Sequence, residues 1–154
     1  MARKFLVVAD DTPEFAAALS YASRRARATG GRVALLRVIA PAAYQHWSGV
    51  REEIEREQRA EAEALLTRHA VTAEARSGQT PVLLIEQGDP EAAIRKAVAE
   101  DPEIKILVLA AAAGGRSPGP LVSAMLKGGL STGRPLPVTV VPGDLSEAAI
   151  EDLA

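Results

Sequence analysis

The chain alternates between short apolar runs and longer segments in which charged and small residues are mixed. The first apolar run covers residues 4–9 and stops at Asp10, with Thr12 and Pro13 directly behind it. An apolar run without polar alternation is typical of a strand buried on both faces of a parallel sheet. A threonine followed by a proline indicates the start of a helix, with Thr12 as its cap and Pro13 at its first position.

The same order of strand and helix signals recurs along the chain. Strands are expected at residues 4–9, 32–39, 81–86, 104–111 and 138–141, and helices at 13–29, 50–75, 90–100, 120–127 and 147–153. Gly30 is expected to end the first helix, and Asp89 and Ser146 are expected to cap the third and the last. Strands that alternate with helices imply right-handed crossovers and a doubly wound sheet. The sequence therefore predicts one α/β domain over residues 1–154, in three layers.

Composition narrows the classes of protein that fit this pattern. The chain has 154 residues, of which 47% are hydrophobic and 25% charged, as in an ordinary soluble domain. No apolar run reaches the length of a membrane span, and we read no export signal. Cysteine is absent, which excludes thiolate chemistry and fits a cytoplasmic location. A net charge of −2 gives no basic footprint, so neither nucleic acid nor a membrane is an expected partner.

Asp10 is the first candidate for a functional residue, because open α/β sheets bind ligands at the carboxyl ends of their strands. The glycine fingerprint of dinucleotide-binding domains is missing after this strand. Residues 115–119 match the G-x-S-x-G pattern of a hydrolase nucleophile, but Pro118 has no N–H for an oxyanion hole. His46 and His69, the two histidines, both precede that serine, and their spacing fits no recognised metal site. Neither a serine hydrolase nor a metal centre is expected.

Two loops leave alternatives open. The small-residue loop at residues 114–117 offers free N–H groups, an arginine and a hydroxyl, which suit a phosphate; it is equally well explained as a turn that needs glycine. The loop from Tyr44 to Trp47 follows the second strand, whose carboxyl end borders the expected ligand crevice. Trp47 is expected either beside this crevice or as an anchor for the long helix. His69 lies in that charged helix and is expected on its surface.

Several segments together resemble the universal stress protein family, and the match covers nearly the whole chain. They are Phe5–Thr12, Ala34–Ile39, Gly88-Asp89-Pro90, Leu107–Leu109, Gly115-Arg116-Ser117 and Pro137–Val141. The resemblance implies a Rossmann-like fold of the adenine nucleotide alpha hydrolase type, with five parallel strands in the order 3-2-1-4-5. It also makes the fifth strand a sheet edge that is too apolar to leave exposed, so a homodimer through this strand is expected.

The resemblance also implies a set of site residues. In ATP-binding members of the family, the aspartate and neighbouring backbone hold the adenosine, the valine of the second strand reads the adenine, and a late glycine loop holds the phosphates. Residue by residue, this carries over to Asp10, Thr12, Val38, Gly88, Gly115, Arg116 and Ser117.

The phosphate half of this motif departs from the family pattern G-x2-G-x9-G-[S/T]. Ala112 replaces the first glycine, and the closing pair falls on residues 125–126 or 124–125, neither of which is glycine with a hydroxyl residue. Prolines on both sides of Gly119 remove two further N–H donors. We therefore expect a binding or signalling module that holds AMP, ADP or ATP weakly, with a role for Mg²⁺ left open. The alternatives are a ligand-free interaction protein with a vestigial site and a weak nucleotide hydrolase, and the latter lacks an identifiable general base.

Overall fold

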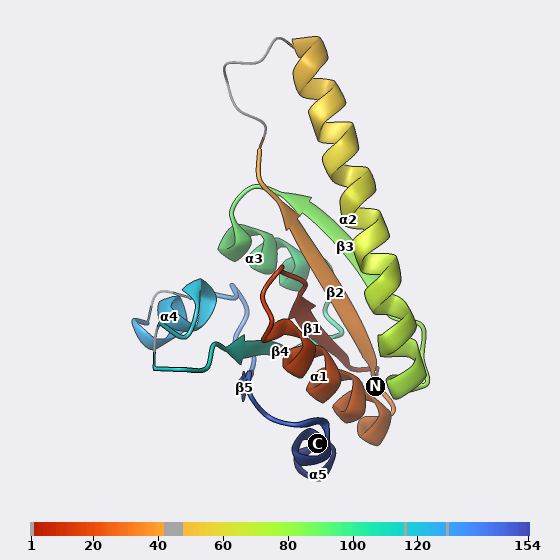
Figure 1. Cartoon of the computed structure of the whole chain (residues 1–154), viewed down its shortest axis with the longest axis vertical. Coiled ribbons are helices and arrows are strands. Elements are labelled where there is room, and N and C mark those ends of the chain that lie inside the picture. Colours follow the sequence, from red (N-terminus) through yellow and green to blue (C-terminus); the bar gives the residue numbers. More distant parts are fainter. Residues whose placement is uncertain (1, 42–47, 116, 129) are drawn as a thin grey trace.

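The chain folds into an open sheet of five parallel strands between two layers of helices (Figure 1). The structure is a computed structural model that describes residues 2–41, 48–115, 117–128 and 130–154. Its elements are β1 (Lys4–Val8), α1 (Phe15–Thr29), β2 (Arg32–Ile39), α2 (Ser48–Ser77), β3 (Val82–Gln87), α3 (Pro90–Glu100), β4 (Ile104–Ala111), α4 (Pro120–Leu126), β5 (Val138–Pro142) and α5 (Glu147–Leu153). The strand order is β3-β2-β1-β4-β5, which confirms the predicted fold class and the order that the resemblance implied.

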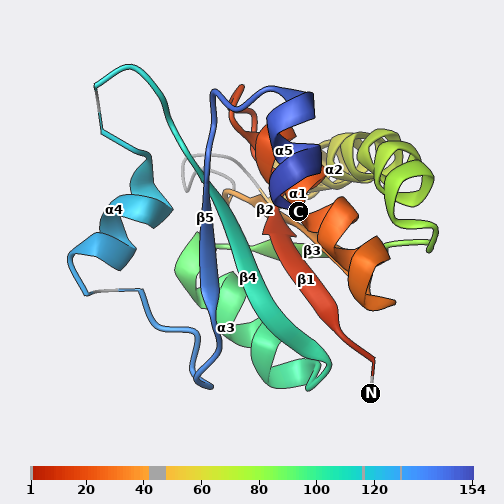
Figure 2. The same ribbon diagram turned by 90° about the horizontal axis from the view of Figure 1, so that it is seen from below.

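The two faces of the sheet carry separate apolar cores, because side chains alternate along each strand. Val7 and Leu35 pack with α1, α2 and α5, whereas Leu6 and Leu36 pack with α3 and α4. Figure 2, seen from below, shows α3 and α4 on one side of the strands and α1, α2 and α5 on the other. β1 is buried on both faces, which explains its unbroken apolar sequence.

The helix ends follow the predicted caps in three places and depart from them in one. Gly30 ends α1 in a left-handed conformation, with φ of 70°, and β2 begins two residues later at Arg32. Asp89 accepts a hydrogen bond from the Ala92 N–H at 3.0 Å, and Ser146 accepts one from the Ala149 N–H at 3.1 Å. These three predictions are confirmed.

Thr12 does not cap α1, so that prediction is wrong. The helix begins at Phe15, its cap position is Glu14, and no side chain there accepts a hydrogen bond from the first turn. The hydroxyl of Thr12 donates instead to the carboxylate of Asp10. The helix starts two residues later than predicted, so Thr12 stands outside its cap position and belongs to the turn at Asp10.

The strand order places a topological switch point between β1 and β4. β1 lies in the sheet between β2 and β4, and the chain enters β2 directly after α1 but reaches β4 only after β3 and α3. Connections therefore leave the carboxyl ends of these two strands toward opposite faces and open a crevice there. No helix in the described ranges is long and apolar enough to cross a membrane.

Candidate functional site

The connection that follows β1 holds Asp10 in a compact turn. Its Oδ1 atom accepts hydrogen bonds from the Thr12 N–H at 3.1 Å and from the Thr12 hydroxyl. The Ala9 N–H donates to the Leu36 carbonyl at 2.8 Å, so sheet pairing continues up to the turn. Asp10 is exposed and bonded on one oxygen only among the described residues, which leaves Oδ2 free to accept a donor from a ligand.

Arg37, the charged residue near the carboxyl end of β2, fastens this turn to the neighbouring strand. Its Nη1 donates to the Ala9 carbonyl at 2.9 Å, and its Nη2 donates to Oδ2 of Asp11 at 3.1 Å. A planar guanidinium suits such a double contact because its donors are fixed in a fork. Arg37 therefore holds the backbone carbonyl before Asp10 and the side chain of the residue after it.

A hollow of about 240 Å³ lies at the carboxyl ends of β1 and β2, and we call it the crevice. Its lining includes Asp10, Val38, Asp89, Glu91, Pro120 and Leu121. Three of them are carboxylates, against the single guanidinium of Arg37 that also borders it. This surplus of acceptors favours hydroxyl and amine donors on a ligand over phosphate groups.

A smaller hollow of about 60 Å³ lies beside the crevice, bordered by Thr12, Phe15 and Gly119. Asp10, Pro120 and Leu121 line both hollows. The amino end of α4 thus stands at the boundary between the two, and its first residue is a proline without an N–H. The position of α4 limits the space that a ligand can use next to Asp10.

The remaining residues expected at the site lie at different distances from the crevice. Gly88 precedes the lining residue Asp89 and has a φ of +119°, a conformation that favours glycine. Gly115 and Ser117 appear in the lining of neither hollow, and the Ser117 hydroxyl lies 3.1 Å from that of Ser123. Arg116 and the loop from Tyr44 to Trp47 lie outside the described residues. The structure thus brings Asp10, Thr12 and Val38 together, with Gly88 adjoining.

Gly143 packs closely against the end of β4 and against Glu14, which borders the smaller hollow. Its N–H donates to the Ala111 carbonyl at 2.8 Å, which ties the end of β5 to the end of β4. A Cβ atom at this position would lie 2.7 Å from the same carbonyl oxygen and would overlap the Cβ of Glu14. Only glycine allows this close approach, because both of those neighbours are held by backbone contacts.

His69 is half-buried, so the expectation that it lies on the helix surface is wrong. Its ring packs against Phe15 with 4.6 Å between the ring centroids, and Phe15 in turn lines the smaller hollow. Burial is the main cause that lowers the pKa of His69, and the nearby charges of Arg68 and Arg37 lower it further. The imidazole is therefore neutral at pH 7 and acts as packing beneath the site.

The described residues form no cluster of three or more histidine, aspartate or glutamate side chains that could hold a metal ion. The crevice offers carboxylate acceptors, an apolar wall from Val38 and Leu121, and the backbone of two strand ends. These groups suit recognition of a flat or hydroxylated molecule.

Sequence reasoning missed two parts of this site. The sequence predicts only a helix start at Pro120 and Leu121, because nothing local shows how a helix is angled against a sheet. The contacts of Arg37 had a visible signal, a charge near the carboxyl end of a mostly apolar strand, but its partners Ala9 and Asp11 lie in the connection after a different strand.

The open parallel sheet with a crevice at its switch point defines a small, doubly wound α/β domain. The universal stress protein family model matches residues 1–122, and the chain belongs to this family. The comparison with curated proteins found no match. Solved structures share the fold at low identity.

Universal stress protein UspA from Lactobacillus plantarum is 24% identical, with a TM-score of 0.70 over 90% of this chain and 97% of that one. A universal stress protein solved in complex with cAMP is 16% identical, with a TM-score of 0.63 over 92% of this chain and 98% of that one. A family protein from Arabidopsis thaliana, solved with AMP bound, is also 16% identical, with a TM-score of 0.58 over 91% of each chain. At such identities the likeness concerns the fold.

Proposed function

We propose that this chain is a dimeric binding module of the stress response whose crevice holds an adenine nucleotide weakly. The observation that carries the proposal is the meeting of Asp10 and Val38 in one hollow at the switch point. Asp10 would accept hydrogen bonds from the ribose, and the strand end at Val38 would meet the base. Two structural neighbours were solved with AMP and with cAMP, which supports an adenine nucleotide as the ligand class.

The phosphate side of the site supports weak binding. The crevice of about 240 Å³ lies just below the range of about 300–1,000 Å³ that is usual for small-molecule pockets. Its carboxylates repel a polyanion, and Pro118 and Pro120 supply no N–H at the turn into α4. A nucleoside fits these groups better than a triphosphate does. A metal ion is not part of the proposal.

AMP is expected to bind about as tightly as ATP, because the second and third phosphates would gain few donors. Isothermal titration calorimetry with AMP, ADP and ATP tests this directly. An ATP preference of tenfold or more, equivalent to about 1.4 kcal/mol, would contradict the proposal. No measurable heat with any of the three would favour the ligand-free interaction protein instead. Steady product release from ATP would favour a hydrolase.

The proposed dimer forms through β5, an edge strand that pairs only with β4 within the described chain. Val138 and Val140 pack against the α3 and α4 core, but the outer backbone edge of the strand has no partner there. Pairing with the same strand of a second copy around a two-fold axis would satisfy these groups. Sedimentation is expected to give twice the chain mass of 16.2 kDa, and a Thr139→Lys variant is expected to shift it toward the monomer. A monomer at micromolar concentration would rule the dimer out.

A further inference from the structure

A third hollow, larger than the two already described, lies on the other face of β2 from the crevice, between the end of that strand and α2. Its volume is about 750 Å³, within the usual range of about 300–1,000 Å³ for small-molecule pockets. We call it the α2 groove and define it by Asp11, Arg37, Ile39, Gln58, Leu65 and Arg68. Because Val38 faces the α3 and α4 core, Arg37 and Ile39 on either side of it face α2.

The groove exists because the amino-terminal part of α2 extends past the sheet and no longer packs against it. Ala62, Leu66 and Ala73 are buried, whereas Ile54 and Gln58, nearer the amino end, are only half-buried. β2 ends at Ile39, and Figure 1 shows α2 running on well beyond the strands. The space between strand end and helix is left open at this level.

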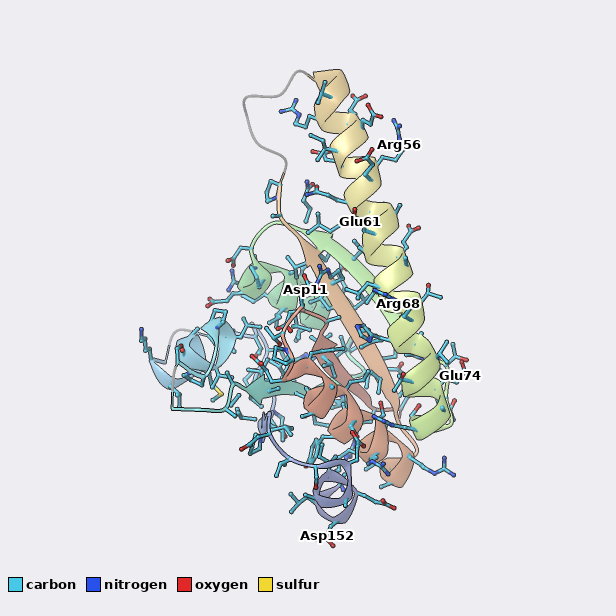
Figure 3. All side chains as sticks on the ribbon, viewed as in Figure 1. Asp11, Arg56, Glu61, Arg68, Glu74 and Asp152 are labelled. Carbon is cyan, nitrogen blue, oxygen red and sulfur yellow. The ribbon has the colours of Figure 1, made fainter. Side chains whose placement is uncertain are left out.

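One end of the groove carries an excess of positive charge. Arg68 is exposed and forms no ion pair with any residue in the described ranges, while Arg37 is paired with Asp11. The charges of Arg68 and Arg37 lower the pKa of His69, and the opposing effect of Asp11 is smaller than either. Positive charge therefore also prevails around this histidine. Figure 3 shows Asp11 in the connection after β1 and Arg68 on the neighbouring stretch of α2. An anion placed here would be attracted by two guanidinium groups.

The other end of the groove offers an unused acceptor. The Oε1 atom of Gln58 is buried and receives no hydrogen bond from the described part of the chain. A buried polar atom without a partner costs about 1–3 kcal/mol, so turning this amide oxygen toward a donor on a ligand in the groove would be favoured. Gln58 and Arg68 are ten positions apart, or about 15 Å along a helix, with Leu65 on the wall between them.

We propose that the α2 groove binds a small organic monoanion with an apolar body and a hydrogen-bond donor. Its anionic group lies against Arg68 beside Arg37, its body lies on Leu65 and Ile39, and its donor meets Oε1 of Gln58. Glu61, two helical turns from Arg68, also borders the groove and disfavours a second negative charge. The groove shares Arg37 and Val38 with the crevice but opens on the other face of β2, so a monoanion can bind there whether or not the crevice holds a nucleotide.

The dye 6-(p-toluidino)naphthalene-2-sulfonate has the required features, namely one sulfonate, an apolar ring system and an N–H donor on the opposite end of the rings from the sulfonate. The folded wild-type protein is expected to bind one dye molecule saturably with a rise in fluorescence. Arg68→Glu is expected to weaken binding about tenfold or more, since it replaces attraction by repulsion. Arg56→Glu makes the same charge change on an exposed turn of α2 outside the groove (Figure 3) and is expected to leave affinity within about twofold.

Equal affinity in the Arg68→Glu and Arg56→Glu variants would overturn the proposal, and so would the absence of saturable binding at millimolar dye. Competition by AMP would also overturn it, because the dye would then occupy the crevice. Gln58→Leu provides a second test that keeps the side-chain volume and removes the acceptor, with weaker binding expected. Circular dichroism of each variant checks that the fold is retained, because the dye also binds partly unfolded chains.

Discussion

Replacing Gly143 by alanine is expected to lower the free energy of unfolding by about 1–3 kcal/mol, the usual cost of forced overpacking. The added Cβ would lie 2.7 Å from the Ala111 carbonyl oxygen and would overlap Glu14. Neither neighbour is the far end of a flexible side chain. The strain is relieved only if the end of β5 moves away from β4, which breaks the hydrogen bond from the Gly143 N–H to Ala111.

Thermal or denaturant unfolding measures this effect, and each kcal/mol corresponds to about 2–4 °C in a chain of this size. Gly49→Ala is the matched control, because an alanine Cβ there meets no atom within 4 Å and its φ is not in the left-handed region. Gly49 lies in the first turn of α2, so alanine is expected to leave stability unchanged or to raise it slightly. Equal stability of the two variants would show that the end of β5 is not packed tightly against Ala111 and Glu14.

The strands were the part of this fold that the sequence predicted best. The bounds of β2 and β4 match their predictions. Each is a mostly apolar segment of eight residues, with glycine, proline or a charged residue close to its ends. Their order in the sheet came from the resemblance alone, because hydrophobic periodicity carries no information about which strand lies beside which. Pairing is decided by contacts between residues far apart in the chain.

The candidate site was predictable only where its residues are set by a strand end. Asp10 follows the end of β1 and Val38 lies next to the last residue of β2, and a parallel sheet brings such positions to one edge. The cap prediction for Thr12 failed because the pattern of threonine and proline does not show that α1 starts only at Phe15. The wall at Leu121 depends on the angle of α4, and the need for glycine at residue 143 depends on a contact with α1. Neither leaves a pattern in the neighbouring sequence.

Asp10→Ala is expected to abolish measurable nucleotide binding while the protein stays folded. A hydrogen bond to a charged group contributes about 1.5–3 kcal/mol, and its loss weakens binding by about ten- to a hundredfold. For a ligand that already binds weakly, this places the affinity beyond the reach of calorimetry. The fold is expected to survive, because Asp10 is exposed and its carboxylate bonds only to Thr12 among the described residues.

Asp152→Ala is the control for this variant, since it removes the same charge from an exposed position on α5, far from the crevice (Figure 3). It is expected to bind AMP as the wild-type protein does. A parallel loss in both variants would mean that the effect comes from net charge at a distance. Unchanged AMP affinity in Asp10→Ala would remove this residue from the site, and the ligand would then have to be held by the strand end at Val38 and the acidic residues at the start of α3.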